Sequence, residues 1–403
     1  MLDLDNEYYK KSNKRVTGNI RKERWLMLKI LHLADLHLGW KPNFLGTQAA
    51  KWQSERDQIF TGCVDYAVDP DNRINLVLIV GDLFDNHTPD QALVTAVMSQ
   101  LQRLVDRGIT VVTVPGNHDE FTYPDSVYRQ RFREWPGILV REPQPSHVAS
   151  REINGTPCHI YSLAYIGGLT QTSPAIQQFP RQEAEGWHIA AFHGSLDWDA
   201  GDRSLPLSGE ALGQAGYDYV ALGHIHRPAQ HSLARGIAVY PGNLIGKGWH
   251  DPGCGQLTVV TLDRDGVQVE KVAFSHPARR EFQRLEIDIG RYLSLKELLD
   301  ALRARIQPEA FVSLQLIGTA NFQVQAEQIK EALSRSCFYL EVEDLTETYP
   351  PALLDAWARE TTLRGYYIRQ LRERLAAAKN EREQRLVSRA LIHGLKALGG
   401  GGE

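Results

Sequence analysis

The chain has 403 residues, of which 42% are hydrophobic, and its formal net charge is −4. This length allows a large core and more than one domain. The slightly negative net charge excludes a basic field over the whole molecule. A nucleic-acid partner must therefore be held by local patches or by metal ions. The four cysteines are far apart in the sequence, which excludes a disulfide framework or a zinc ribbon and fits a reducing cytoplasm. No window of the sequence approaches the roughly 18 apolar residues that a membrane span requires.

Residues 1–26 carry seven lysines and arginines without the apolar stretch of a signal peptide. We expect a disordered basic leader, upstream of the natural start at Met27. A basic arm that contacts DNA remains the alternative.

The next segment alternates apolar runs with helical patterns. Buried strands are predicted at 28–33, 76–80 and 109–114, and helices at 48–68 and 92–107. On the second helix, Leu93, Val97, Leu101, Leu104 and Val105 are expected to form one apolar face. This β-α-β-α-β order predicts an α/β fold with a largely parallel sheet.

Further strands are predicted in 137–163, at 187–192 and 217–222, and across 237–274, where Asp263–Gly266 forms a hairpin turn; a short helix is expected near 207–214. Five apolar strands in total end in a cluster of glycine, histidine or aspartate. Glycines 81, 116 and 223 are expected to permit tight turns there.

The pattern changes near residue 280. A strand at 282–289, a helix opened by the capping box Ser294–Glu297, a strand at 311–317, a helix at 325–334 and a strand at 337–342 predict a small α+β domain. Past residue 350 the chain is predicted to form two helices, each with an apolar stripe between charged faces.

The polar residues that follow the five strands can form one metal site. Seven of them supply carboxylate, amide and imidazole donors: Asp35, His37, Asp82, Asn117, His193, His224 and His226. We assign Asp82 as the bridge between two divalent cations, with Asp35, His37 and His226 on one and Asn117, His193 and His224 on the other. This mixed donor set favours Mn²⁺, with Fe or Zn as alternatives.

Three neighbouring residues receive supporting roles. A water between the two cations is the expected nucleophile, and His118 is the expected general acid that protonates the leaving oxygen. Asp85 is expected to orient one of the metal ligands without binding a metal ion itself. Asp119 either does likewise or caps the following turn.

In these motifs the chain resembles the calcineurin-like metallophosphoesterase superfamily. The stretches HLADLHLG, GDLFD, PGNHD, FHG and GHIHRP, followed by Tyr240–Asn243, resemble the SbcD-type DNA repair exonucleases and their YhaO-like branch. The resemblance covers roughly residues 28–275 and implies a four-layer β-sandwich flanked by helices. By position it implies a metallophosphoesterase domain over 27–278, a capping domain over 279–345 and a helical segment over 350–398.

The resemblance implies a two-metal phosphodiesterase that hydrolyses DNA in repair, as an exonuclease and also as an endonuclease. The alternatives are a phosphatase or a small-nucleotide phosphodiesterase of the same superfamily, or a subunit that is inactive without its partner. Asn86 follows Asp85, and Asp119 ends the PGNHD motif. A phosphoprotein phosphatase usually has Arg-Gly at the first place and Glu at the second, so these residues argue against that class.

The resemblance also implies partners. The C-terminal helices would bind the coiled coil of an SMC-like ABC ATPase, and helices of the first domain would form a homodimer. The alternative for the C-terminal stripes is that they pack on the chain's own core or on each other as an αα-hairpin.

Overall fold

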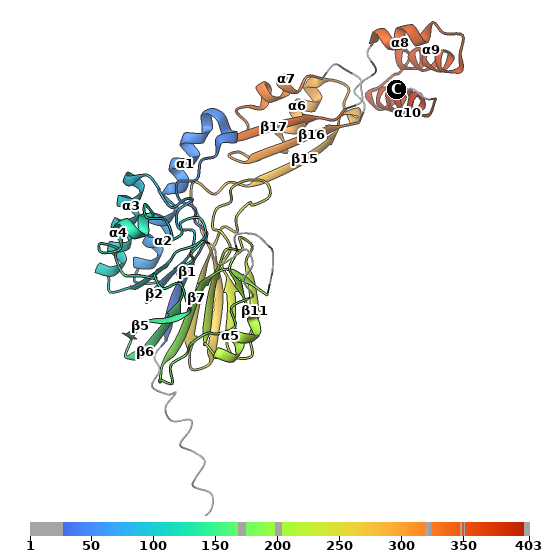
Figure 1. Ribbon diagram of the computed structural model, residues 1–403. Coiled ribbons are helices and arrows are strands. Elements are labelled where there is room, and N and C mark those ends of the chain that lie inside the picture. The colour runs from blue at the N-terminus through green and yellow to red at the C-terminus, as the bar shows by residue number, and fades with distance from the viewer. Residues whose placement is uncertain are drawn as a thin grey trace, which may run out of the picture. The chain divides into compact units, whose positions relative to one another are not determined.

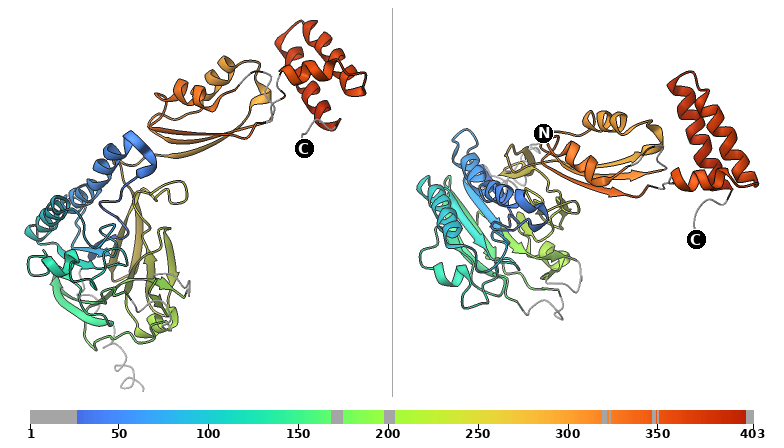
Figure 2. Two further views of the ribbon diagram at one scale, coloured as in Figure 1. Left: turned by 45° about the horizontal axis from the view of Figure 1, so that its top comes forward. Right: turned by 90° about the horizontal axis from the view of Figure 1, so that it is seen from above.

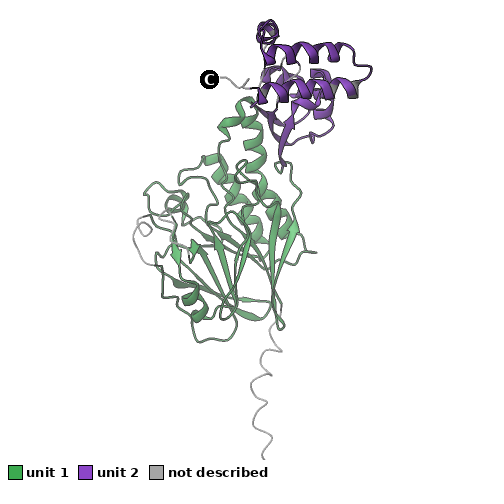
Figure 3. Cartoon of the chain, turned by 90° about the vertical axis from the view of Figure 1, so that its right-hand side faces the viewer, with its two compact units in different colours: residues 1–279 green, residues 280–403 purple. Residues whose placement is uncertain are grey.

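The computed structural model describes residues 27–167, 175–197, 204–318, 322, 324–346, 349 and 351–398. The leader predicted for residues 1–26 lies outside this part of the chain. Two compact units are present, residues 1–279 and 280–403 (Figure 3). Among the described residues, no helix is both long and apolar enough to cross a membrane.

The first unit contains two six-stranded sheets. The first has the order β14-β13-β1-β2-β3-β4, in which β1, β2, β3 and β4 run parallel. Its strands are β1 (Leu28–Leu33), β2 (Leu76–Val80), β3 (Thr110–Val114), β4 (Ile138–Leu139), β13 (Gln256–Asp263) and β14 (Gly266–Ala273). β13 and β14 form the predicted hairpin, in which Asp263 pairs with Gly266.

The second sheet has the order β11-β12-β10-β7-β6-β5. Its strands are β5 (Ser146–Ile153), β6 (Thr156–Ser162), β7 (Trp187–His193), β10 (Tyr219–Gly223), β11 (Ala229–Ser232) and β12 (Ile237–Tyr240). β6, β7, β10 and β12 are parallel, and the two edge strands run antiparallel to them.

The two sheets pack face to face and helices cover their outer faces (Figures 1 and 2). One apolar core joins them, with Ile30 and Leu78 from the first sheet against Ile189 and Tyr219 from the second. Helices α1 (Ala49–Asp57), α2 (Ile59–Val68) and α3 (Gln91–Asp106) lie on the side of the first sheet, and α5 (Gly209–Ala215) packs on the second through Leu212. The predicted four-layer α/β sandwich is confirmed.

Short elements complete the first unit. They are η2 (Asn43–Gln48), α4 (Val127–Arg131), β8 (Ser195–Leu196) and β9 (Pro206–Leu207). The helical character expected over 48–68 is confirmed, and the chain forms it as α1 and α2 with a break at Gln58, whose N–H donates to the Glu55 carbonyl oxygen.

The second unit begins with a three-stranded parallel sheet of order β15-β16-β17, covered on one face by two helices. Its elements are β15 (Phe282–Asp288), η3 (Ile289–Arg291), α6 (Leu295–Arg303), β16 (Phe311–Ile317), α7 (Ala326–Leu333) and β17 (Tyr339–Asp344). Ser294 caps α6 by accepting from the Glu297 N–H at 3.2 Å, as predicted. The Glu297 carboxylate accepts from the Leu293 N–H at 2.9 Å.

Three helices follow, α8 (Pro351–Ala358), α9 (Leu363–Ala376) and α10 (Glu381–Ala397). The expectation of two helices is wrong because Thr362 caps a new helix by accepting from the Gly365 N–H at 3.1 Å. α9 and α10 pack on each other through Ile368, Leu371, Leu391 and Leu395, which favours the αα-hairpin alternative for these residues.

Candidate metal centre

The carboxyl ends of strands from both sheets meet at one end of the sandwich. Parallel pairing aligns Leu33 with Ile79 and Ile79 with Thr113 in the first sheet, and Gly223 with His193 in the second. The loops that leave these strands therefore start side by side. Backbone bonds from Asp35 N to Gly81 O (3.1 Å) and from Gly81 N to Val114 O (3.0 Å) extend the first sheet into the site.

All seven sequence-predicted ligands gather there. Ligand atoms of Asp35, His37 and His226 lie within 4.8 Å of one another, as do those of Asp35, Asp82 and His193. Asn117 joins them through its Oδ1, which lies 2.9 Å from His193 Nε2 and 3.0 Å from His224 Nδ1.

Asp82 lies between the two proposed sets of ligands. Its Oδ2 is 3.7 Å from His37 Nε2 and 3.6 Å from His193 Nε2, and its Oδ1 accepts from the His118 N–H at 2.9 Å. One carboxylate oxygen thus faces both sets equally, as a bridging ligand requires.

The hydrogen bonds of the histidines show which ring nitrogens carry lone pairs. His226 Nδ1 lies 2.8 Å from Asp251 Oδ2, and His193 Nδ1 lies 3.0 Å from the Val80 carbonyl oxygen. Because these oxygens only accept, Nδ1 of each ring carries a proton, and in the neutral form of the ring Nε2 is the nitrogen open to a metal ion. His37 Nδ1 faces the Asp85 carboxylate, with 3.3 Å between Nδ1 and Oδ1.

The Nε2 atoms lie close to one another and to the Asn117 oxygen. His37 Nε2 and His226 Nε2 are 3.2 Å apart, and His193 Nε2 lies 2.9 Å from Asn117 Oδ1. With each ring neutral and its proton on Nδ1, these contacts would place lone pairs against one another, and a cation between them would relieve that repulsion. The donor set therefore fits divalent cations on the physical chemistry of its own contacts.

Burial and local charge set the protonation of the cluster. Burial raises the pKa of Asp35 to about 6 against the opposing effect of His193 and His226, and burial lowers the pKa of His37 to about 4. Burial would also raise the pKa of Asp82, but His193, His37 and His118 outweigh it and hold that pKa below its ordinary value. Burial would lower the pKa of His226, but the hydrogen bond to Asp251 and the charge of Asp35 raise it above its ordinary value. A bound cation would compete with that proton, because metal ligation requires the deprotonated form of each ligand.

Four of the ligands have left-handed backbones. Their φ angles are 56° at Asp35, 47° at His37, 50° at Asp82 and 95° at His224. Such angles are costly for residues with a side chain and cluster at functional sites.

The glycines act differently from one another. Only Gly81 has the predicted turn conformation, with φ +80°. Gly116 and Gly223 are needed for space, because a Cβ on Gly116 would overlap the Asp82 carboxylate and one on Gly223 the Val80 carbonyl oxygen. These two glycines therefore permit the close approach of the loops rather than a positive φ.

His118 lies at the edge of the cluster. Its ring contacts that of His37 edge-on, with centroids 4.7 Å apart, and its Nδ1 lies 3.0 Å from the Asp85 carbonyl oxygen. The Nδ1 proton is donated to that oxygen, which leaves Nε2 for a substrate. The ring is half-buried, whereas His37 and His193 are each 1% exposed.

The two supporting aspartates have different contacts. Asp85 faces His37, as expected. Asp119 accepts from the Gly116 and Phe84 N–H groups at 2.8 and 3.0 Å and from the Tyr128 hydroxyl at 2.7 Å, so it ties the loops together and contacts no ligand through these bonds. These bonds go to the preceding Gly116 and to Phe84 and Tyr128, so they match neither the orientation of a ligand nor a cap of the following turn.

Sequence reasoning missed Asn243 and Asp251. Asp251 contacts His226, and Asn243 Nδ2 donates to both oxygens of Asp251 at 2.8 Å. Lys247 of the same loop donates to Asp85 Oδ1 at 3.0 Å. Asn243 lies within the motif that follows GHIHRP, but the motif does not indicate this contact, and no spacing marks Lys247 or Asp251 in the glycine-rich loop after β12.

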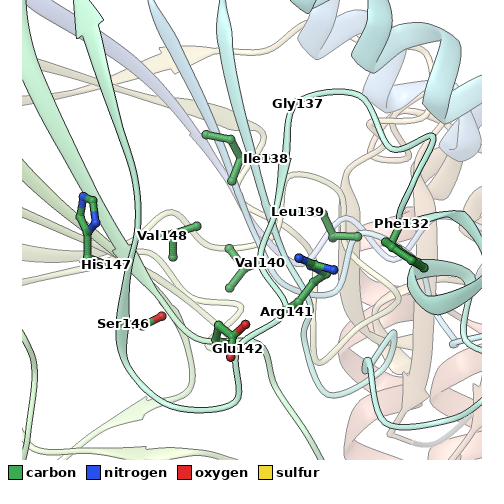
Figure 4. Close-up of a pocket in the computed structure, with 10 residues that line it drawn as sticks. All are labelled: Phe132, Gly137, Ile138, Leu139, Val140, Arg141, Glu142, Ser146, His147 and Val148. Atoms are coloured by element: carbon green, nitrogen blue, oxygen red, sulfur yellow. The ribbon is translucent and has the colours of Figure 1, made fainter.

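A separate cavity opens between the edge strands β4 and β5, away from the cluster (Figure 4). Phe132, Arg141, Glu142 and His147 help to line it, and the Arg141 guanidinium lies over the Phe132 ring at 5.5 Å. No ligand of the cluster is among the residues that line this cavity.

Comparison with known proteins identifies relatives of this chain. The family profile described as calcineurin-like phosphoesterase matches residues 28–228. The uncharacterized metallophosphoesterase YhaO of Bacillus subtilis is 28% identical over 54% of this chain and 53% of its own length. The DNA double-strand break repair protein Mre11 of Methanopyrus kandleri is 24% identical over 84% of this chain and 77% of its own. The Mre11 of Aeropyrum pernix is 28% identical over 66% of this chain and 64% of its own. The matches thus span about half to three quarters of these relatives.

Proposed function

Because residues 28–228 belong to the calcineurin-like phosphoesterase family, the chain is a metal-dependent hydrolase of phosphoric esters, and we propose that it hydrolyses the phosphodiester backbone of DNA. The similarity to proteins named for double-strand break repair, over up to 84% of this chain, supports DNA as the substrate. The reaction is exonucleolytic, with endonuclease activity in addition, and its setting is DNA repair.

The observation that carries the proposal is the convergence of seven donors from two sheets around Asp82. Asp35, His37 and His226 would hold one divalent cation and Asn117, His193 and His224 a second, with Asp82 facing both sets of ligands. Two such ions, most simply Mn²⁺ with Fe or Zn as alternatives, supply Lewis-acid activation of a water and of the phosphate oxygens.

His118 is the proposed general acid. The Asp85 carbonyl oxygen fixes the ring through Nδ1, so that Nε2 can give a proton to the leaving 3′ or 5′ oxygen. The ring is half-buried and open to a substrate, whereas His37 and His193 are each 1% exposed.

The proposed partner is an SMC-like ABC ATPase that binds the C-terminal helices. α9 and α10 bury one apolar stripe between themselves, but Leu363, Tyr366 and Leu386 are 70%, 56% and 70% exposed. Such exposed large apolar residues support a partner surface in addition to the hairpin. A homodimer and a cytoplasmic location, with free thiols at Cys63 and Cys158, belong to the same proposal.

A comparison of substrates tests the proposal. The purified chain with Mn²⁺ is offered DNA, bis-p-nitrophenyl phosphate, p-nitrophenyl phosphate and cyclic nucleotides. We expect hydrolysis of DNA and of the small diester. Preference for the monoester or for cyclic nucleotides would instead establish a phosphatase or a small-nucleotide phosphodiesterase, and DNA cleavage only with the ATPase present would establish a partner-dependent subunit.

A further inference from the structure

The loop of residues 243–251 contacts the proposed metal centre through His226. Asp251 Oδ2 accepts the Nδ1 proton of His226 at 2.8 Å. Asn243 fixes this carboxylate, because its Nδ2 donates to both Asp251 oxygens at 2.8 Å. The orientation of the His226 ring is thus set by the loop.

The same loop also reaches His37. Lys247 Nζ donates to Asp85 Oδ1 at 3.0 Å, and this oxygen lies 3.3 Å from His37 Nδ1. Lys247 therefore holds the carboxylate that faces the second histidine of the same set.

A buried arginine anchors the loop. Arg56 is 2% exposed and donates to the Ile245 carbonyl oxygen at 3.2 Å and to that of Gly246. Its guanidinium lies over the rings of Trp40 and Trp52, at 4.9 and 5.2 Å. A buried charge is costly unless its hydrogen bonds are made, so the loop backbone is firmly held.

The other set of ligands is oriented differently. His193 Nδ1 donates to the Val80 carbonyl oxygen, which belongs to the sheet. Asn117 Oδ1 lies 3.0 Å from His224 Nδ1, and the His224 N–H donates to Asp35. Within these contacts, none comes from residues 243–251.

We propose that Asp251 is a positioning residue for the cation held by Asp35, His37 and His226, and that Lys247 supports the same position through Asp85. A carboxylate on Nδ1 raises the basicity of Nε2, and such partners are worth about 10–100-fold in metal affinity. In the other set, His193 is oriented by the Val80 carbonyl oxygen of the sheet, so the loss of affinity is expected at the first cation. This inference rests on the two-metal set of the proposed function.

Counting and titrating bound Mn²⁺ in the full chain tests the inference. We expect two ions in the wild type, and in Asp251→Asn one ion bound as before and one weakened about 10–100-fold. Lys247→Met should weaken the same ion to a smaller extent, and Asp251→Glu should restore part of the affinity. Asp218→Asn is the matched control and should bind both ions normally. Asp218 accepts from the His188 N–H at 2.9 Å and immediately precedes β10, whereas the ligand His224 follows the other end of that strand.

Unchanged binding in Asp251→Asn, or equal weakening of both ions with the fold intact by circular dichroism, would overturn the inference while leaving the two-metal site in place. A wild-type chain that binds fewer than two ions would remove the ligand set itself, and the inference with it. Excess Mn²⁺ should restore hydrolysis of bis-p-nitrophenyl phosphate in Asp251→Asn, which a general collapse of the site would not allow.

Discussion

Among the single residues of the centre, His118 contacts the cluster without belonging to either set of ligands. Replacing it with alanine should lower turnover by about 10²–10⁴-fold, the usual contribution of a general acid. Both metal ions should remain, because the contact between His118 and Asp82 is made by the backbone N–H. Single-turnover hydrolysis and Mn²⁺ content of the same sample measure the two effects, and normal turnover would refute the role.

A second histidine, His32, affects stability instead of chemistry. It is fully buried on β1, with Nδ1 2.8 Å from the Tyr219 hydroxyl, and burial, aided by Lys271, lowers its pKa to about 3. The unfolded chain binds the proton near pH 6.5, so this group's contribution to stability is complete above pH 6.5. It is lost as the pH falls from 6.5 toward 3, by up to about 1.4 kcal/mol per pH unit.

The test compares urea unfolding of the wild type and His32→Gln in EDTA at pH 7.5 and 5. The variant is expected to be less stable at pH 7.5 but to lose less stability between the two pH values. Parallel pH profiles for the two proteins would contradict the assigned burial of a neutral imidazole.

Among the elements, the strand ends position the site, and the glycines that end them determine how closely the loops approach. Gly81→Ala should weaken Mn²⁺ binding, because a Cβ there would overlap the His193 ring and φ is +80°. Gly108→Ala is the control: φ is +73° but nothing lies within 4 Å of its Cβ. Isothermal titration should show the loss of affinity only in Gly81→Ala, while both variants lose about 1–2 kcal/mol of stability from the strained backbone.

The element predictions succeeded where hydrophobic runs were short and bounded by polar residues. β2 and β16 begin and end at the predicted residues. Each is a single apolar-rich run, of five residues in β2 and seven in β16. The helices were less predictable, since their ends depend on single hydrogen bonds. α3 buries Val94, while Val105 is 37% exposed, so its buried face is turned from the predicted one by tertiary packing.

The candidate site was predictable as a set of strand-end residues but not as a network. Every proposed ligand follows a strand that the sequence marks, and the parallel register brings these ends together. Asp251, 25 residues beyond His226, reaches the centre only because Arg56 and Asn243 fold the loop back. Contacts of this kind depend on tertiary structure and leave no periodic pattern.

For the whole molecule, substitutions in the C-terminal helices test whether a partner binds there. Leu363→Asp and Leu386→Asp together should abolish co-purification of an SMC-like ABC ATPase without changing unfolding, because both side chains are 70% exposed. Ile368→Ala, at a fully buried position between α9 and α10, should instead cost about 2–5 kcal/mol of stability. Retained co-purification with the double variant would place the partner elsewhere.

The most direct test of the central claim is cleavage of labelled single- and double-stranded DNA by the purified chain, with and without Mn²⁺, beside His118→Ala. The proposed centre predicts Mn²⁺-dependent cleavage that is lost in the variant while both ions stay bound. Intact DNA, with two ions bound and bis-p-nitrophenyl phosphate hydrolysed, would contradict DNA as the substrate of the isolated chain.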